Sequence, residues 1–238
     1  MSTPPKSVDY DFHNPPRPSR SLSGRIAIIT GAGSRAAGIG NGRAASILLA
    51  EAGAQVVCVD LNLDWAKATV SMITSEFGTD SALAFKGDVT KPSECKAAVD
   101  FALEKFGRVD ILVNNVGIAG PMGTAVDVDP EEWTKGMEAN VASMMLMAKY
   151  AVPAMEKNSL KEGAYKGRGV IVNIASVAGL VGGTPMLLYP TSKGAVVNMT
   201  RAMAVHHAPS GIRVNCVCPG EQHFLTSTLE TTANLCFQ

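Results

Sequence analysis

Tyr189 and Lys193 lie four residues apart in the stretch YPTSK, at the head of an amphipathic segment, 189–207. On a helix this spacing places both side chains on one face. A free phenol titrates near about 10, and a neighbouring ammonium stabilises phenolate, which makes a tyrosine a usable base near neutral pH. Such a pair is mostly coincidental when it stands alone, so other features must support acid–base chemistry.

A glycine-rich stretch, TGAGSRAAGIGNG at 30–42, directly follows an apolar run, 25–30, and opens the first long helix. This order of strand, loop and helix is the context in which such a stretch binds a dinucleotide. The glycines let the backbone approach a pyrophosphate, and a helix starting near Gly38 offers unpaired N–H groups and a positive dipole end. A plain flexible turn is the alternative interpretation.

Asp60 closes the second apolar run, 54–60, about 20 residues beyond the loop. A carboxylate there accepts hydrogen bonds from both ribose hydroxyls of adenosine and repels a 2′-phosphate, so we expect NAD as the cofactor. Arg35, inside the loop, leaves NADP open because a flexible guanidinium can reach a 2′-phosphate. A strand-end turn residue is the structural alternative for Asp60.

The elements that position these residues alternate between short apolar runs and longer amphipathic stretches. This alternation predicts an α/β fold, with right-handed βαβ units around a doubly wound parallel sheet. The nearly continuous apolar runs are typical of strands that are buried on both faces. The expected strands are 25–30, 54–60, 82–85, 109–115, 169–176 and 211–217, and the expected helices are 41–52, 64–77, 92–106, 131–155 and 189–207.

The composition narrows the class of protein. A chain of 238 residues, 46% of them hydrophobic, can bury a sizeable core as one domain. Its 21 basic and 21 acidic residues balance, which favours a small-molecule partner over nucleic acid or a membrane. No apolar run could span a bilayer and no signal core opens the chain, so we expect a cytoplasmic protein. The five cysteines contain no C-x-x-C pair, so neither a disulfide framework nor a metal site is predicted.

The domain organisation follows from these patterns. Residues 1–22 are rich in proline and indicate a disordered leader, with a polyproline ligand at Pro15–Pro18 as the alternative. Residues 23–220 are expected to form the dinucleotide-binding and catalytic domain, and 221–238 an atypical tail.

The combined motifs resemble the short-chain dehydrogenase/reductase family over residues 24–220. The matching pieces are Thr30-Gly31 with Gly38-Ile39-Gly40, GDV at 87–89, NNVG at 114–117, Asn140, VNIAS at 172–176, YPTSK at 189–193 and RVNCVCPG at 213–220, in the family's order and approximate spacing. This family implies a Rossmann fold and NAD(P)-dependent oxidoreductase activity.

The resemblance also implies residue roles. Tyr189 would be the general acid/base, Ser176 would hydrogen-bond the substrate oxygen, and Lys193 would bind the nicotinamide ribose and support the Tyr189 phenolate. Asn140 would hold a water that links Lys193 to solvent, and Asn114 would brace the central strands. The implied cofactor-binding residues are Gly31, Gly38, Ile39, Gly40, Asp60, Asp88, Val89, Asn115, Gly117, Tyr189, Lys193, Pro219 and Gly220, with Asp88 and Val89 against the adenine.

Three features depart from the family pattern. Six residues, 32–37, separate Thr30-Gly31 from Gly38, where three are usual, so the phosphate loop is longer. Val116 replaces the usual alanine, which we expect the fold to tolerate. Only 18 residues follow Gly220, so we expect the sheet to lack the family's last strand, turnover to be poor and the exposed strand 211–217 to promote self-association.

The sequence therefore predicts an oxidoreductase that interconverts a secondary alcohol and a ketone with NAD. An NADPH-dependent ketoreductase and a catalytically silent dinucleotide-binding protein remain the alternatives. The apolar, glycine-rich stretch 177–188 suggests an apolar or cyclic substrate, and the family implies a homodimer or homotetramer built on the helices 131–155 and 189–207.

Overall fold

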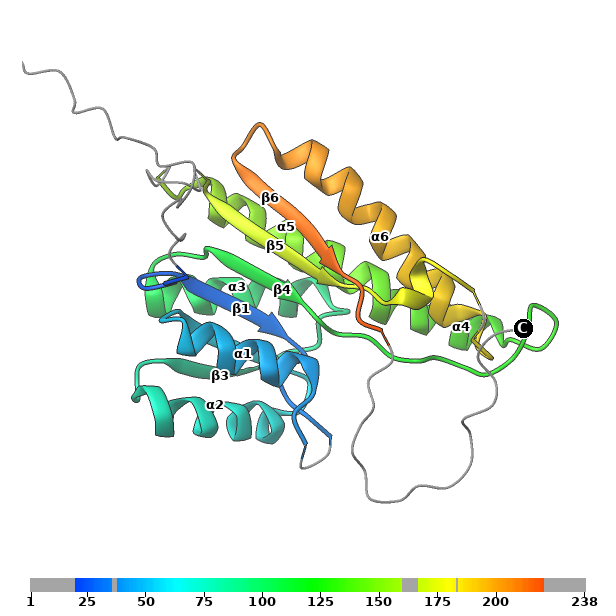
Figure 1. Cartoon of the computed structure of the whole chain (residues 1–238), viewed down its shortest axis with the longest axis horizontal. Helices are drawn as coiled ribbons and strands as arrows, with labels where there is room; N and C mark the ends of the chain where they lie inside the picture. The colour runs from blue at the N-terminus through cyan, green and yellow to red at the C-terminus, as the bar shows by residue number, and fades with distance from the viewer. Residues whose placement is uncertain (1–19, 36–37, 160–166, 183, 221–238) are drawn as a thin grey trace, which may run out of the picture.

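The computed structural model describes residues 20–35, 38–159, 167–182 and 184–220. Helices cover a six-stranded sheet (Figure 1). Apart from residues 20–22, the predicted leader lies outside the described residues, as does the tail 221–238. Among the helices of the described part, none has the length and apolar character needed to cross a membrane.

The sheet is parallel throughout, with the strand order β3-β2-β1-β4-β5-β6. The order reverses between β1 and β4, and open α/β sheets bind ligands at the carboxyl ends of strands at such a switch point. The predicted doubly wound sheet is therefore confirmed. The strands are β1 Ile26–Thr30, β2 Gln55–Asp60, β3 Ala82–Lys86, β4 Ile111–Asn114, β5 Gly169–Ile174 and β6 Ile212–Val217.

Polar side chains cap the N-terminal ends of two helices, α2 and α4. The Asn62 side chain accepts hydrogen bonds from two backbone N–H groups at the start of α2, and Asp129 does the same for α4, where Pro130 holds the first position. The helices are α1 Asn41–Glu51, α2 Leu63–Phe77, α3 Pro92–Phe106, α4 Pro130–Met137, α5 Ser143–Glu156 and α6 Leu188–His207, with a π turn η1 at Glu138–Ala142 and a 3-10 turn η2 at Val177–Gly179.

One helix prediction needs correction. Helix α1 begins at Asn41, as the pattern over 41–52 predicts, and Gly40, rather than Gly38, is its N-cap, with extended backbone angles. The single helix expected over 131–155 is instead α4, the π turn η1 and α5 in succession. The periodicity of 131–155 is helical on either side of the turn, so it does not reveal the interruption.

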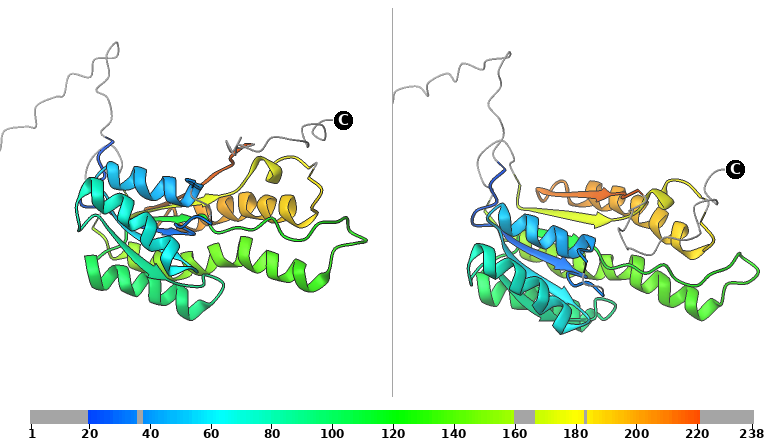
Figure 2. Two further views of the ribbon diagram at one scale, coloured as in Figure 1. Left: turned by 90° about the horizontal axis from the view of Figure 1, so that it is seen from below. Right: turned by 60° about the horizontal axis from the view of Figure 1, so that its bottom comes forward.

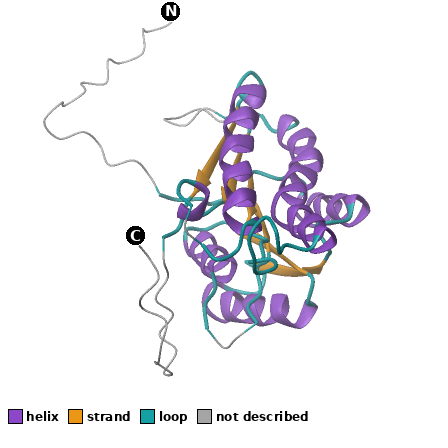
Figure 3. Cartoon of the chain, turned by 90° about the vertical axis from the view of Figure 1, so that its right-hand side faces the viewer, coloured by secondary structure: helices purple, strands orange, loops and turns teal. Residues whose placement is uncertain are grey.

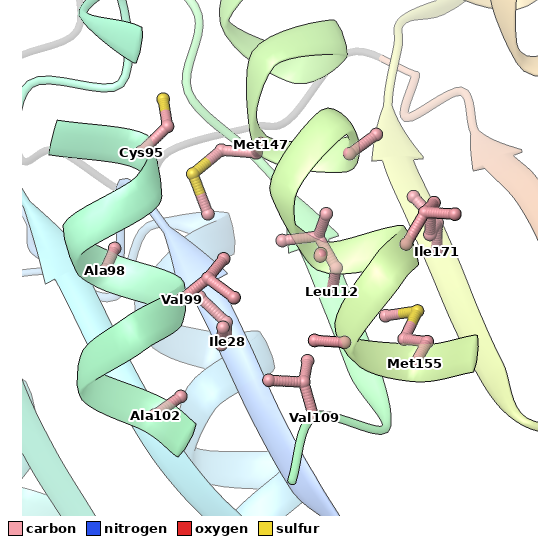
Figure 4. Close-up of a cluster of buried hydrophobic side chains, with 14 of the residues drawn as sticks. Ile28, Cys95, Ala98, Val99, Ala102, Val109, Leu112, Met147, Met155 and Ile171 are labelled. Carbon is pink, nitrogen blue, oxygen red and sulfur yellow. The ribbon is translucent and has the colours of Figure 1, made fainter. Parts of the chain in front are cut away.

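Helices α3, α5 and α6 pack on one face of the sheet, and α1 and α2 pack on the other (Figure 2). Figure 3 shows helices around the central strands. The larger core lies under α3 and α5. There Ile28 and Leu112 of the central strands pack with Val99 and Met147 of these helices, all nearly inaccessible to solvent (Figure 4). This packing holds the central strands, whose carboxyl ends form the site.

The strands at the β6 side are not buried on both faces, contrary to the prediction. Burial alternates along β5 and β6, and Arg213, Asn215 and Val217 are exposed. The cause is the placement of α1 and α2, which cover β1, β2 and β3 but leave this face of β5 and β6 without a helix in the described part. β6 is also the edge strand of the described sheet.

Candidate active site

A pocket of about 350 Å3 lies at the carboxyl ends of β1, β2, β3 and β4. Six of the predicted cofactor residues line it: Gly31, Asp60, Asp88, Val89, Asn115 and Gly117. The other predicted cofactor residues are not part of its lining. Ile39 among them is 57% exposed, which places this part of the loop at the protein surface.

The start of the phosphate loop is tied to the end of β4. Gly31 has a φ of 62°, a conformation that favours glycine. The Asn115 amide Nδ2 donates to the carbonyl oxygens of Thr30 (3.2 Å) and Gly31 (3.0 Å), and its backbone N–H donates to the Thr30 hydroxyl. A Cβ on Gly42 would overlap the Gly31 carbonyl, so α1 packs directly on this turn. Gly42 is the close-packing glycine that the sequence analysis missed.

A buried arginine holds both ends of the longer loop. Arg43 Nη1 donates to the Gly38 carbonyl (2.8 Å) and its Nε donates to the Thr69 hydroxyl (3.1 Å). Thr69 in turn donates to the Ala32 carbonyl (2.8 Å). Arg43 was not predicted, although a charged residue among the buried positions of α1 is a signal that could have identified it.

Asp60 is held in position before any ligand binds. Its two carboxylate oxygens accept the backbone N–H groups of Gly33 and Asn62, both at 2.9 Å. A Cβ on Gly33 would lie 2.5 Å from Trp65 Cβ and 2.8 Å from Asp60 Oδ2, so the loop fits against β2 and α2 only with glycine there. The carboxylate is therefore oriented at the pocket wall.

Asp88 is also oriented by its neighbours. Its Oδ1 accepts both the backbone N–H and the hydroxyl of Thr90, and its Oδ2 lies 3.7 Å from Lys91 Nζ. Burial raises the pKa of this carboxyl, but the Thr90 hydrogen bonds and the Lys91 charge outweigh that effect and hold it below its ordinary value. Asp88 thus presents a carboxylate to the pocket.

Lys193 and Tyr189 form a pair at the start of α6. Lys193 is only 3% exposed, its Nζ donates to the Ile174 carbonyl at 2.9 Å, and the same Nζ lies 5.8 Å from the centre of the Tyr189 ring. Burial lowers the pKa of Lys193 to about 8, against a smaller opposite effect of Cys218. The ammonium is fixed between the end of β5 and the phenol, as the helical spacing predicts.

Ser176 follows β5 and is held near this pair by backbone contacts. Its hydroxyl accepts the Ala178 N–H (3.2 Å) as the cap of η2, and the Val177 N–H donates to the Pro219 carbonyl (3.0 Å). A Cβ on Gly179 would lie within 2.7 Å of the Lys193 carbonyl group and of the Gly194 nitrogen. The turn that carries Ser176 therefore lies directly against the α6 backbone, a contact that the sequence analysis did not anticipate.

Asn140 lies fully buried in the π turn. Its amide Nδ2 donates to the Ile118 carbonyl and to the Ser192 hydroxyl, both at 2.9 Å, and its Oδ1 accepts the Ile118 N–H at 2.7 Å. A Cβ on Gly117 would lie 3.0 Å from Lys193 Nζ and 3.5 Å from Asn140 Oδ1. Asn140 therefore links η1, the loop after β4 and α6 beside Lys193.

Asn114 connects the central strands to α6. Its amide donates to Asn173 Oδ1 on β5 (2.9 Å), and the Asn173 amide donates to the Thr200 hydroxyl on α6 (2.9 Å). This chain of buried amides fixes α6, and with it Tyr189 and Lys193, relative to the strands.

A parallel sheet with a pocket at its switch point, near a half-buried tyrosine paired with a buried lysine and a serine, is the arrangement expected of a dinucleotide-dependent oxidoreductase. Comparison with known proteins supports the same class of protein. A family model described as short chain dehydrogenase matches residues 25–232. An uncharacterized oxidoreductase of Thermotoga maritima is 42% identical over 200 residues, which cover 84% of this chain and 72% of that protein.

Two further relatives have stated activities or ligands. The cyclohexanol dehydrogenase of an Acinetobacter species is 36% identical over 202 residues, covering 85% of this chain and 74% of that one. A solved structure of 7α-hydroxysteroid dehydrogenase complexed with NADH and 7-oxo glycochenodeoxycholic acid has a TM-score of 0.74 at 39% identity, covering 85% of this chain and 72% of the other. The chain belongs to the short-chain dehydrogenase/reductase family and is an oxidoreductase.

Proposed function

We propose that the protein oxidises a secondary alcohol to a ketone, or reduces the ketone, with NAD as the hydride carrier and Tyr189 as general acid/base. The observation that carries the proposal is the Lys193 ammonium, which is buried, bonded to the Ile174 carbonyl and placed 5.8 Å from the Tyr189 ring centre. A cation so fixed stabilises a phenolate more than a solvated lysine would.

The pocket supports binding of the adenosine end of a dinucleotide, since Gly31, Asp60, Asp88 and Asn115 line it. Gly31 and Gly33 pack so closely against neighbouring side chains that a Cβ would displace the phosphate loop. We assign the ribose hydroxyls of adenosine to Asp60, the adenine to Asp88 and Val89, and the nicotinamide ribose to Tyr189 and Lys193. When bound, NAD supplies the hydride acceptor.

The protein residues handle the proton and position the substrate. In the oxidation, the Tyr189 phenolate accepts the proton of the alcohol, and in the reduction the phenol returns a proton to the ketone oxygen. The Ser176 hydroxyl orients the same oxygen. Asn140, held beside Lys193, supports the path by which the proton reaches solvent.

NAD is favoured over NADP by the oriented Asp60 carboxylate, which a 2′-phosphate would approach as a like charge. Arg35 also lines the pocket, and this supports NADPH-dependent ketone reduction as the second candidate. Calorimetric titration with both cofactors separates them: NAD should bind more tightly, and equal or tighter NADP binding would favour the second candidate.

Exposed apolar side chains near the site support a proposal for the substrate class. Two segments, around Gly123 and Met186, pair through an isolated parallel bridge, and large apolar side chains on and beside them are exposed. These are Ile118, Met122, Leu180, Val181 and Leu187. We propose an apolar or cyclic alcohol, which the cyclohexanol and hydroxysteroid relatives support.

The test is a turnover screen over cyclic and aliphatic secondary alcohols, followed by Tyr189→Phe on the best substrate. General acid–base catalysis contributes about 100-fold to 10,000-fold, so kcat should fall by that range while NAD affinity stays nearly unchanged. Retention of most activity would move the proton transfer to another group. Binding of NAD without turnover of any alcohol would support the catalytically silent alternative.

A further inference from the structure

Two thiols lie together at the carboxyl end of β6. Cys216 is in the strand and Cys218 follows it directly, so the alternation of a strand places both side chains on one face. Both are half-buried and pack against the same apolar cluster, which includes Val196 and Val197 of α6. Burial raises the pKa of the Cys216 thiol, and the neighbouring Cys218 raises it further.

This pair adjoins the catalytic machinery. Pro219, the next residue, accepts the hydrogen bond from Val177 that holds the Ser176 turn. Ile174, whose carbonyl accepts the Lys193 ammonium at 2.9 Å, pairs in the sheet with Val217, the residue between the two cysteines. The other cysteines of the described part differ, since Cys58 and Cys95 are fully buried and burial raises their pKa to about 12 and about 11. Cys216 and Cys218 are therefore the partly accessible thiols of the described residues.

The distance between the two cysteines determines whether they form a disulfide or bind a metal ion more easily. Two same-face residues of a strand have Cα atoms about 6.6 Å apart, near the upper limit for a disulfide, whose Cα separation is usually about 5.5–6 Å. A metal ion bound to two sulfurs at about 2.3 Å each allows the sulfurs to lie up to about 4.6 Å apart. A bridging ion thus fits this backbone with less distortion than a direct S–S bond.

We propose that Cys216 and Cys218 form a binding site for a soft monovalent metal ion of the Cu(I) type, held between the two sulfurs. Thiolates select soft ions. On binding, two S–H bonds break, two S–metal bonds form and two protons leave to solvent, with no change of oxidation state. The product is a bis-thiolate with one net negative charge beside the Lys193 ammonium, and it fixes the segment that leads into Pro219.

The probe is Ag(I), a monovalent soft ion that is stable in air, added to the full chain. We expect one ion per chain at high affinity, a metal–thiolate absorption in the ultraviolet and two protons released per ion. Loss of a supporting residue around a metal already costs 10–100-fold in affinity, so Cys216→Ser and Cys218→Ser should each cost about 100-fold or more. Cys236→Ser is the matched control and should leave the tight site intact.

Two results would overturn the two-sulfur site, and a third would overturn the preference for a metal bridge. NAD binding by each Ser variant, measured by tryptophan fluorescence, verifies that the variant is folded. Release of one proton per ion, or a tight site that survives either single substitution, would overturn the two-sulfur site. Rapid formation of a Cys216–Cys218 disulfide with hydrogen peroxide, seen by mass spectrometry of the peptide, would overturn the geometric preference for a metal bridge.

Discussion

Lys193 combines two conflicting requirements at one residue. Its proposed role needs a positive charge, yet the side chain is buried and its pKa is lowered to about 8, mainly by loss of solvation. The difference from the ordinary value of 10.5 corresponds to about 3 kcal/mol against the charged folded state. This cost is a property of the folded protein that stability measurements can detect without a substrate.

The sign of the pH dependence follows from proton binding. Below pH 8, Lys193 is protonated in the folded and unfolded states alike, and the folded state carries the whole cost. Between pH 8 and 10.5 the unfolded state binds more protons, so the contribution of Lys193 to the free energy of unfolding rises with pH. From pH 7 to pH 9.5, the wild type should gain about 2 kcal/mol relative to Lys193→Met. Urea unfolding at both pH values checks this, and parallel pH slopes for the two proteins would contradict it.

At the scale of elements, the contact between η2 and α6 should control activity. A Cβ on Gly179 would lie 2.5 Å from the Lys193 carbonyl carbon, so Gly179→Ala must push the Ser176 turn away from α6. We expect a loss of about 1–3 kcal/mol of stability from overpacking and a larger relative loss of kcat. Gly182→Ala is the matched control, because a Cβ at Gly182 has no neighbour within 4 Å. Equal activities of the two variants would show that this contact does not position Ser176.

The second element-scale prediction concerns Arg43, whose side chain holds the phosphate loop in place. Arg43→Met keeps the unbranched stem of the side chain as far as the Nε position but removes its hydrogen bonds to Gly38 and Thr69. Hydrogen bonds from charged groups contribute about 1.5–3 kcal/mol, so NAD affinity should fall by about 10-fold or more while kcat at saturating NAD changes little. Arg43→Lys retains the charge without the two-point geometry and should recover only part of the affinity. Titration calorimetry measures all three proteins, and unchanged affinity in Arg43→Met would remove Arg43 from loop positioning.

The sequence predicts the strands well and the contacts between elements poorly. The six apolar runs and their order are local signals, and each corresponds to a strand of the structure. The Tyr189–Lys193 pair is likewise local, because one helix turn carries both residues. Gly179 and the π turn depend on neighbours distant in the chain, so no local pattern could reveal them, whereas Arg43 carries one local signal, its charge among the buried positions of α1. Burial of β5 and β6 on one face only was missed for the same reason.

At the scale of the whole molecule, the described part of the sheet ends at an edge strand. β6 is the last strand of the described sheet, and its outer face exposes Arg213, Asn215 and Val217. We expect self-association through this edge, in addition to a family-type homodimer or homotetramer on the helices α4, α5 and α6. Val217→Lys should shift gel filtration toward smaller species because edge charges oppose pairing, whereas Val126→Lys, at a 93% exposed position outside the sheet, should not. An elution volume unchanged by Val217→Lys would locate association on the helices instead.

The strand order also determines when each strand can find its partner while the chain is being synthesised. β1 is buried on both sides in the finished sheet, and one of its edges pairs with β4, where Ala27 meets Ile111 84 residues later in the chain. At a synthesis rate of about 5–20 residues per second, β1 leaves the ribosome about 4–17 s before its partner exists. During that interval the nascent chain carries an apolar strand with a free edge. The half-made polypeptide therefore exposes a strand edge that the complete sheet covers, and we expect chaperones that bind the first hundred residues to protect the chain at this stage.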